Sequence, residues 1–315
     1  MKKITKYIPT IILTLLCSCS DYLDIVPDNV TTLDIVFNNR NTAERYLANC
    51  YHFVPDHGSV KRIPGMGAGH ECWFYTTNDS HFDNEVSFYI ARGLQNIDAP
   101  YANYWDGEGG SNLPMFRAIR ECNIFLDYVR DQHKVNDLTD SERKRWIAEV
   151  NVLKAYYHFF LFEHYGPIPI VDKALPVSTD PEGVKVTRMP VDQIVDYMVK
   201  LIDDSYKDLP PVITMEATEM GRLTQPAALA LKAKILLWAA SPLFNGNKDY
   251  ANFRNEEGKP FINQEFSREK WVRTAEACKE AIESADGLYR SFFATRKWKR
   301  SSNRQYFAKQ GSRCI

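Results

Sequence analysis

The chain has 315 residues, of which 44% are apolar and 25% charged. This is the composition of a globular protein, long enough for one large domain or two ordinary ones. Its 39 Lys and Arg residues nearly balance its 40 Asp and Glu residues, and the net charge is −1. Such a balance creates no global field that would hold nucleic acid, so we expect no nucleic-acid partner.

The N-terminal residues have the pattern of a secretory signal. Three lysines precede an apolar run at 11–16, which is far shorter than the roughly 20 residues that span a bilayer. Residues 16–19, Leu-Cys-Ser-Cys, then resemble a lipobox, which implies cleavage before Cys19 and acylation of that residue. We therefore predict a lipoprotein signal peptide over residues 1–18 and a lipid anchor on Cys19; an ordinary soluble signal, cut beside a neighbouring serine, is the alternative.

The remaining cysteines indicate neither a disulfide framework nor a zinc site. Without the signal peptide and the acylated residue an odd number of five is left, and no two of them have the short spacing of metal ligands. Cys50, Cys122 and Cys278 lie in helical patterns beside apolar neighbours, where cysteine acts as a small hydrophobic residue. The sequence predicts no metal and no cofactor.

The folded body is predicted to begin at about residue 41. Residues 19–40 contain Pro27 and lack helical periodicity, which favours a lipidated N-terminus and an extended tether. Asn41 then has Glu44 three positions later, a capping pattern that predicts a helix ending before Pro55.

Residues 56–112 follow without a sustained period of two or 3.6. Glycines, histidines, aromatics and short acidic stretches alternate there. A long irregular segment in a compact domain is usually functional, so this segment is the first place to look for a site.

Five further helices are predicted beyond the irregular segment. One covers 116–129, and a second begins behind the capping box Thr139 to Glu142 and ends at Gly166-Pro167. The other three are expected at 191–207, at 225–240 behind a Thr224 cap, and at 268–285 behind a Ser267 cap.

Apolar stripes on two of these helices predict the core. Trp146 leads the stripe of the helix behind Thr139, and Trp271, Ala275, Cys278 and Ile282 share one face of the last helix. Paired helices of this kind favour a mostly α fold of tetratricopeptide-like hairpins with long irregular loops.

The end of the chain differs from the rest. Eight Lys or Arg residues and no acidic residue lie between 287 and 315. We interpret 41–298 as an incomplete helical domain and 299–315 as an atypical basic tail, which is either a solvated tail or the product of a truncation or frame shift.

Several segments together resemble SusD/RagB proteins. They are residues 19–24, 114–123, 149–161, 165–169 and 227–245. The most specific match is the sequence Ala-Ala-Ser-Pro-Leu-Phe-Asn-Gly at residues 239–246. The resemblance covers about 19–298 and no single motif carries it alone. It implies a helical tetratricopeptide-like scaffold whose less regular C-terminal portion is missing here, because members are far longer.

The same resemblance implies a function. Such proteins bind oligosaccharides, or peptides in some branches, at the cell surface, and cover a SusC-like TonB-dependent transporter. This chain is therefore expected to be a lipid-anchored, surface-exposed protein of an outer membrane, held by Cys19. The alternatives are a peptide-binding member of the same family and a helical docking protein without its own ligand site.

Aromatic and planar polar side chains in the irregular segment are the candidate ligand site. Sugars present C–H surfaces that pack on flat aromatic rings, and hydroxyl pairs that bond planar polar groups. The candidates are Trp73, Tyr75, Asp79, Arg92 and Tyr101. The alternative is that these aromatics anchor the loop on the helices, and Trp105 is assigned to packing before the 116–129 helix.

Enzymatic motifs are missing from the sequence. It contains no Gly-x-Ser-x-Gly elbow, no His-Glu-x-x-His pattern and no Gly-Lys-Ser/Thr phosphate loop. A hydrolase would need two carboxylates about 5–9.5 Å apart. Asp79, Asp83 and Glu85 are candidates only by proximity, and the sequence favours a protein that is not an enzyme.

Overall fold

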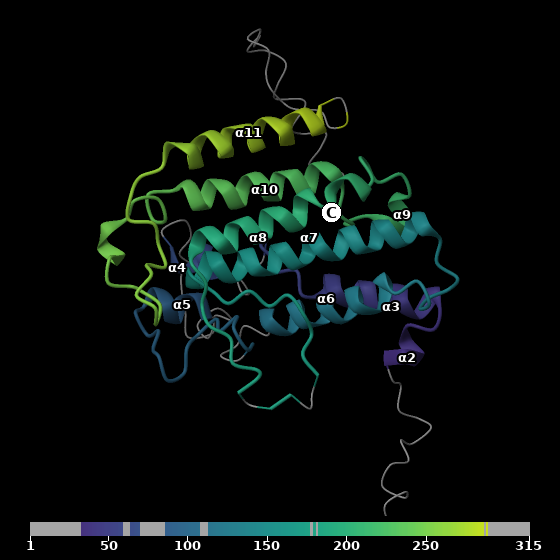
Figure 1. The fold of residues 1–315 in the computed structure, drawn as a ribbon, viewed down its shortest axis with the longest axis horizontal. Helices are drawn as coiled ribbons and strands as arrows, with labels where there is room; N and C mark the ends of the chain where they lie inside the picture. The colour runs from purple at the N-terminus through teal and green to yellow at the C-terminus, as the bar shows by residue number, and fades with distance from the viewer. Residues whose placement is uncertain are drawn as a thin grey trace, which may run out of the picture.

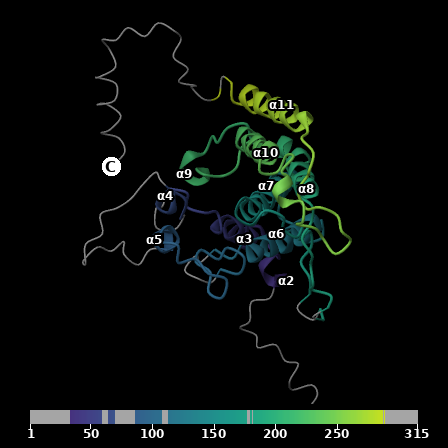
Figure 2. The ribbon, with the colours of Figure 1, turned by 90° about the vertical axis from the view of Figure 1, so that its left-hand side faces the viewer.

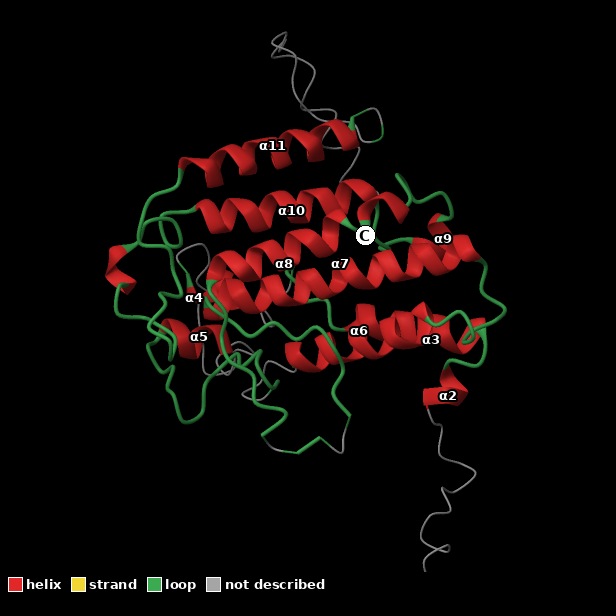
Figure 3. Cartoon of the chain, in the orientation of Figure 1, coloured by secondary structure: helices red, strands yellow, loops and turns green. Residues whose placement is uncertain are grey.

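The computed structural model describes residues 33–58, 64–69, 86–107, 113–176, 179–180, 182–286 and 288. Within these ranges the chain is helical, and its only strand-like pairings are two isolated bridges, Asn245 with Asn263 and Arg254 with Pro260 (Figure 3). No helix among them is both long and apolar enough to span a membrane.

Six long helices form the body. In chain order they are α3 (Arg40–His52), α6 (Met115–Arg130), α7 (Asp140–Tyr165), α8 (Val191–Asp203), α10 (Gln225–Ala240) and α11 (Arg268–Ala285). From α6 onward each packs on the next of these helices, and the chain reverses direction between them, with α11 at one edge of the stack (Figure 1). The predicted mostly helical fold of tetratricopeptide-like hairpins is confirmed.

Shorter elements fill the connections. They are α2 (Leu33–Val36), α4 (Pro64–Ala68), α5 (Val86–Ala91), α9 (Glu216–Glu219) and two 3-10 turns, Tyr206–Asp208 and Lys248–Tyr250. Helices α4 and α5 pack on each other and lie to one side of α3 and α7 (Figure 2). The segment predicted to be irregular therefore holds only these two short helices in its described part.

Helix α7 is the centre of the core. It contacts α3, α6, α8 and α10, and its side chains are buried around most of its circumference. Trp146 is 1% exposed and Tyr157 is fully buried, so the core position predicted for Trp146 is confirmed. A helix that is buried on all sides owes its stability to packing, at about 25 cal/mol for each Å² of apolar surface removed from water.

Local signals set both ends of α7. The Thr139 hydroxyl accepts from the Glu142 N–H, and the Glu142 carboxylate accepts in return from the Thr139 N–H, as the capping box predicts. At the other end Gly166 adopts φ +65°, a backbone conformation in which a residue with a side chain would be strained. The Gly166 N–H donates to the Phe162 carbonyl at 3.0 Å and closes the last turn.

Some predicted caps are corrected. The first long helix is capped by Asn39, whose side chain accepts from the Thr42 N–H at 3.1 Å, and not by Asn41, which lies inside the helix. Thr224 and Ser267 hold the N-cap positions of α10 and α11 but make no side-chain capping bond. The spacing of capping residues in the sequence locates the N-cap of a helix to within a residue or two. The rotamer of the cap side chain then decides whether its hydrogen bond to the backbone forms.

The predicted tether is packed on the body where the structure describes it. Residues 33–36 form α2 and not an extended segment, and Phe37 is fully buried. Its ring stacks on Tyr128 with centroids 4.5 Å apart. The apolar residues of 33–37 therefore join the core, which a search for sustained helical periodicity could not detect.

The apolar stripe of α11 is not core, which corrects the prediction for Trp271. Trp271 is 40% exposed and Ile282 is 64% exposed. The residues that α11 buries against α10 are Thr274 and Ala277, whose small side chains allow the two helices to approach closely. Periodicity correctly grouped the large residues on one face, but that face is not covered by any described element.

The predicted role of cysteine as a small hydrophobic residue is confirmed in the core. Cys50 and Cys122 are fully buried, and Cys278 is half-buried against the core. The hydrogen bond with the neighbouring Cys122 thiol, together with burial, raises the pKa of the Cys50 thiol far above its usual value. The Cys50 thiol therefore stays protonated, and the three cysteines serve packing.

The connection that leaves α7 is fixed at Val171. Its N–H donates to Nε2 of His158 at 3.3 Å, and its carbonyl accepts from Nδ2 of Asn123 at 3.1 Å. Nδ1 of His158 donates to the Lys154 carbonyl at 2.8 Å, so the imidazole is neutral with its proton on Nδ1. His158 thus links α7 to the chain that follows it.

Replacing Thr139 with Ala should lower the free energy of unfolding by about 1 kcal/mol, because it removes the capping bond of α7. Urea denaturation followed by helical circular dichroism measures the change. Ser267→Ala is the matched control at a cap position without a side-chain bond, and should cost little. Equal losses in the two variants would contradict the role given to the capping box.

Stability should fall as the pH drops from about 6.5 to about 4 because of His158. Complete burial lowers the pKa of this imidazole to about 4. Between that value and the ordinary pKa of 6.5 the unfolded chain binds a proton that the folded chain excludes, so acid favours unfolding by up to about 3 kcal/mol. Above pH 6.5 both states are neutral there and the effect vanishes.

His158→Gln tests this pH dependence. The variant cannot titrate, and its side chain can still accept a hydrogen bond from Val171. Its unfolding midpoint should change less between pH 6.5 and 4 than that of the unmodified chain. An identical pH profile in both proteins would assign the acid sensitivity to other groups.

Candidate functional site

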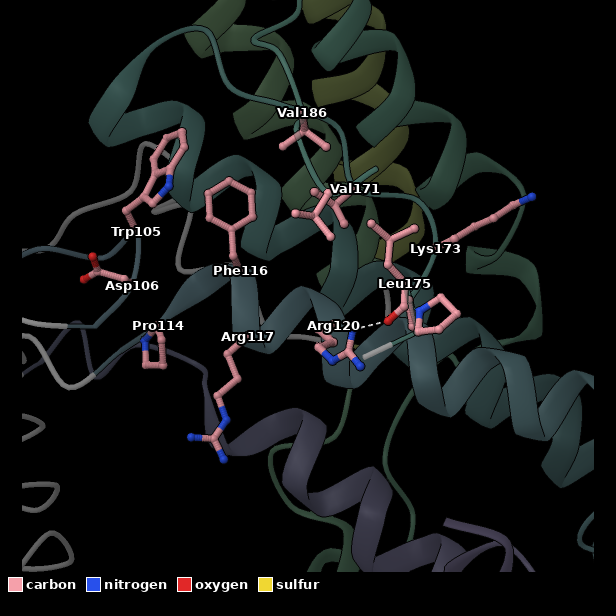
Figure 4. A pocket seen from close by; sticks show the side chains of 13 residues that line it. Trp105, Asp106, Pro114, Phe116, Arg117, Arg120, Val171, Lys173, Leu175 and Val186 are labelled. Carbon is pink, nitrogen blue, oxygen red and sulfur yellow. Dashed lines mark hydrogen bonds between the residues drawn. The ribbon is translucent and has the colours of Figure 1, made fainter. Parts of the chain in front are cut away.

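A hollow of about 710 Å³ lies between the start of α6 and the connection from α7 to α8 (Figure 4). Its residues come from three segments of the chain. They are Trp105, Asp106, Pro114, Phe116, Arg117, Arg120, Val171, Lys173, Ala174, Leu175, Pro176, Val184 and Val186. This volume is in the range of small-molecule sites in proteins.

Trp105 and Phe116 form the aromatic part of the wall. Their ring centroids are 4.6 Å apart in an edge-to-face arrangement, and Tyr165 packs edge-on to Trp105 at 5.5 Å. The guanidinium of Arg188 lies 5.3 Å from the centre of the Trp105 ring. Trp105 is therefore held on several sides, which confirms its predicted packing role beside the α6 helix, and it lines the hollow as well.

Aliphatic side chains on the opposite side are exposed. Leu175 is 37% exposed, Val184 45% and Val186 53%, and all three lie in the connection between α7 and α8. Exposed apolar side chains gathered around one concavity mark a surface for a ligand or partner.

The wall formed by this connection is held by an ion pair between a buried lysine and an exposed aspartate. Lys154 of α7 is 2% exposed, and its Nζ donates to the Asp172 carbonyl at 2.8 Å and to Oδ1 of the same residue at 2.9 Å. The Tyr197 hydroxyl of α8 donates to the same Oδ1 at 2.8 Å. Asp172 lies between Val171 and Lys173, so these bonds hold two lining residues in place.

The ion pair also shifts the ionisation of its members. Burial lowers the pKa of Lys154, and the hydrogen bond to Asp172 offsets this only in part. At Asp172 burial acts to raise the pKa, but the hydrogen bonds from Lys154 and Tyr197 outweigh it and the pKa lies below its usual value.

Basic side chains surround the hollow. Arg120 donates from Nη1 to the Leu175 carbonyl at 2.7 Å and so joins α6 to the connection. Arg117 and Lys173 are exposed and extend from different sides of the hollow (Figure 4). The arrangement offers an apolar wall with cationic groups at its edge, which suits binding. Among the described lining residues no nucleophile lies beside a base, as covalent catalysis would need.

The structure describes two of the predicted ligand residues. Tyr101 is half-buried and stacks on Tyr89 of α5, with centroids 4.9 Å apart and planes 19° apart. The Gln95 side chain bonds the backbone of Tyr101 at both its N–H and its carbonyl. Arg92 is exposed just after α5. Neither residue lines the hollow, although Tyr101 lies only four residues before Trp105.

The other predicted site residues, Trp73, Tyr75, Asp79 and Cys19, lie outside the described residues, as do Asp83 and Glu85. The hollow was not among the sites predicted from the sequence. Its signal was present in Val184 and Val186, the large apolar residues of the otherwise mostly polar stretch 179–188, but this stretch shows no period that would assign them a face.

Among the described residues no group of three or more His, Cys, Asp or Glu side chains is placed to hold a metal ion. His158 and His164 each bond the carbonyl four residues earlier, Lys154 and Phe160, and pack within the protein. Their local partners explain these histidines without a ligand role.

A family profile matches residues 21–237, and the family, SusD-like, is described as starch-binding and associating with the outer membrane. No curated protein is similar enough to this chain to count as a match. The matched residues include α6, α7, α8 and the hollow between them.

Solved structures share the fold. The protein BT4246 is 27% identical with a TM-score of 0.68, over 87% of this chain and 43% of its own. A SusD-like protein from Bacteroides fragilis, BF3747, is 16% identical with a TM-score of 0.55, over 83% of this chain and 40% of its own. A laminarin-binding SusD-like protein is 18% identical with a TM-score of 0.50, over 65% and 41%.

The chain thus spans less than half the length of these solved proteins. The family profile nevertheless covers well over half of the chain itself, and the helical stack agrees with the solved structures. This chain belongs to the SusD-like family.

Proposed function

We propose that this chain is part of a surface lipoprotein that binds glycan nutrients without altering them and delivers them to a SusC-like TonB-dependent transporter. The observation that carries the proposal is the match of residues 21–237 to a family described as starch-binding and associating with the outer membrane. The solved protein of the same fold that is described as laminarin-binding agrees with it.

The chemistry of the hollow supports glycan binding. Sugar rings have C–H faces that pack on aromatic and aliphatic side chains, and hydroxyl groups that need polar partners at the rim. Trp105, Phe116 and Val186 supply the apolar part, and Arg117 and Lys173 supply donors at the edge. Trp73 and Tyr75 of the aromatic segment remain predicted contacts.

Membrane attachment follows from the lipobox-like residues before Cys19. A single acyl chain binds membranes only weakly, whereas several acyl chains on one cysteine anchor a protein stably. Anchoring at Cys19 would leave the helical body outside the membrane, where it can meet polymers and the transporter.

The double substitution Val184→Ser and Val186→Ser should weaken glycan binding about tenfold, because it removes two exposed apolar side chains from the wall of the hollow. Isothermal titration against a panel of soluble polysaccharides measures the affinity, and product chromatography should show the polymers unchanged. Val212→Ser, at a valine 37% exposed on another connection, is the matched control and should bind normally.

Replacing Trp73 and Tyr75 with Ala separates capture from docking. Glycan affinity should fall while co-purification with the transporter is retained, since ring faces bind sugar and the helical scaffold is unchanged. Trp271→Ala, at an exposed tryptophan of α11, is the control for loss of an aromatic side chain. If no glycan binds the unmodified protein, the capture proposal is wrong, and retained transporter association alone would favour a docking protein.

Cys19→Ala should release the protein from the membrane fraction and abolish its labelling by radioactive palmitate, because the acylated atom is lost. Cys50→Ala is the control, since that thiol is buried in the core and cannot carry a lipid. Membrane retention of the Cys19→Ala protein with unchanged labelling would disprove the anchor.

A further inference from the structure

The lining of the hollow carries more positive than negative charge. Arg117, Arg120 and Lys173 are basic, and Asp106 is the one acidic residue among the described lining residues. The Asp106 carboxylate already accepts from Nδ2 of Asn103 at 2.7 Å. An occupant of this hollow therefore meets a net positive surface, whereas the whole chain is close to neutral.

Two of the cations are available to a ligand. Arg117 is 69% exposed, and its Nε lies 3.9 Å from Oε1 of Glu121, at the outer limit of an ion pair. The Glu121 carboxylate also accepts from the Tyr46 hydroxyl, which divides its charge between two partners. Lys173 is exposed and makes no hydrogen bond or ion pair with any described residue.

Three lysines elsewhere on the protein each have a close carboxylate partner. Lys200 pairs with Asp204 at 2.5 Å, Lys232 pairs with Asp203 at 2.7 Å, and Lys270 pairs with Asp192 at 2.5 Å. Carboxylates accompany these lysines, so their charge is largely compensated locally. At the hollow the compensating groups are few.

The third cation, Arg120, is held in place by a hydrogen bond and still has free N–H donors. Arg120 gives one N–H of Nη1 to the Leu175 carbonyl, and a guanidinium has five N–H donors. Its position between α6 and the connection places positive charge beside the apolar wall. A planar guanidinium suits oxyanions, which it can bind through two parallel hydrogen bonds.

The cations are also separated in space. Arg117 extends from α6 and Lys173 from the connection, on different sides of the hollow (Figure 4). A polymer that carries an anionic group on successive rings offers a partner to each of them. The apolar side chains of the hollow can pack on the ring faces of such a polymer.

We infer that the hollow takes an acidic glycan, a polysaccharide whose rings carry carboxylate or sulfate groups, with Arg117 and Lys173 as the residues that select for the charge. The inference rests on the proposed function and assigns its ligand class. The apolar wall then provides affinity for the sugar, and the two cations provide discrimination against neutral polymers.

Matched polymer pairs test the inference on the full chain. Polygalacturonate and its methyl ester share one backbone and differ in the carboxylate, and dextran sulfate and dextran differ in the sulfate. Isothermal titration should show the charged member of at least one pair binding about tenfold more tightly, with the preference reduced at high salt. The pair that shows the preference identifies the anionic group.

Arg117→Gln and Lys173→Gln should each weaken binding of the acidic polymer about three- to tenfold and leave binding of the neutral polymer unchanged. Lys279→Gln is the matched control, at a lysine 75% exposed on α11. Both target residues are exposed, so their replacement should not affect folding, which circular dichroism checks.

Three outcomes would overturn the inference. Equal affinity for the charged and neutral member of both pairs would remove the charge preference and leave glycan capture standing. An equal loss of affinity in Lys279→Gln would show general attraction of polyanions to the surface. Absence of binding to any polymer would overturn the proposed function and the inference together.

Discussion

The bond between Lys154 and Asp172 is the constraint on which the site depends. The Lys154 side chain is 2% exposed, and removing its ammonium group from water is costly unless a partner compensates the charge. The partner comes from the chain just beyond the end of α7, so the connection must fold back against α6 and α8. One wall of the hollow, from Val171 to Leu175, results from that requirement, with Asn123, His158 and Arg120 holding the same stretch.

The helices could be predicted closely because their signals are local. The bounds of α10 and α11 agree with the sequence interpretation, and the capping box of α7 forms as its residues indicate. Periodicity, however, shows only which residues share a face, and not whether another element covers that face. The large residues of α11 were therefore assigned to the core, although Thr274 and Ala277 make its contact with α10.

The hollow could not be predicted because its residues meet only after folding. Phe116 and Arg117 lie on a helix that was predicted, but Val184 and Val186 lie in a connection whose path depends on the Asp172 bonds. The aromatic segment was a reasonable place to seek a sugar site, since composition alone reveals rings and planar polar groups. Composition could not show that Tyr101 uses one ring face on Tyr89, or that Trp105 both packs and lines the hollow.

The buried carboxylate of Glu149 joins parts of the chain that are far apart in sequence, and this constrains the order in which the helices can pack. It is fully buried and bonds Arg145 four residues earlier, Tyr51 of α3, and Arg222, which lies 73 residues later. Closing the first helices around Glu149 before Arg222 is in place would bury a carboxylate with half its counter-charge missing. The stack therefore becomes complete only when the segment before α10 packs on it.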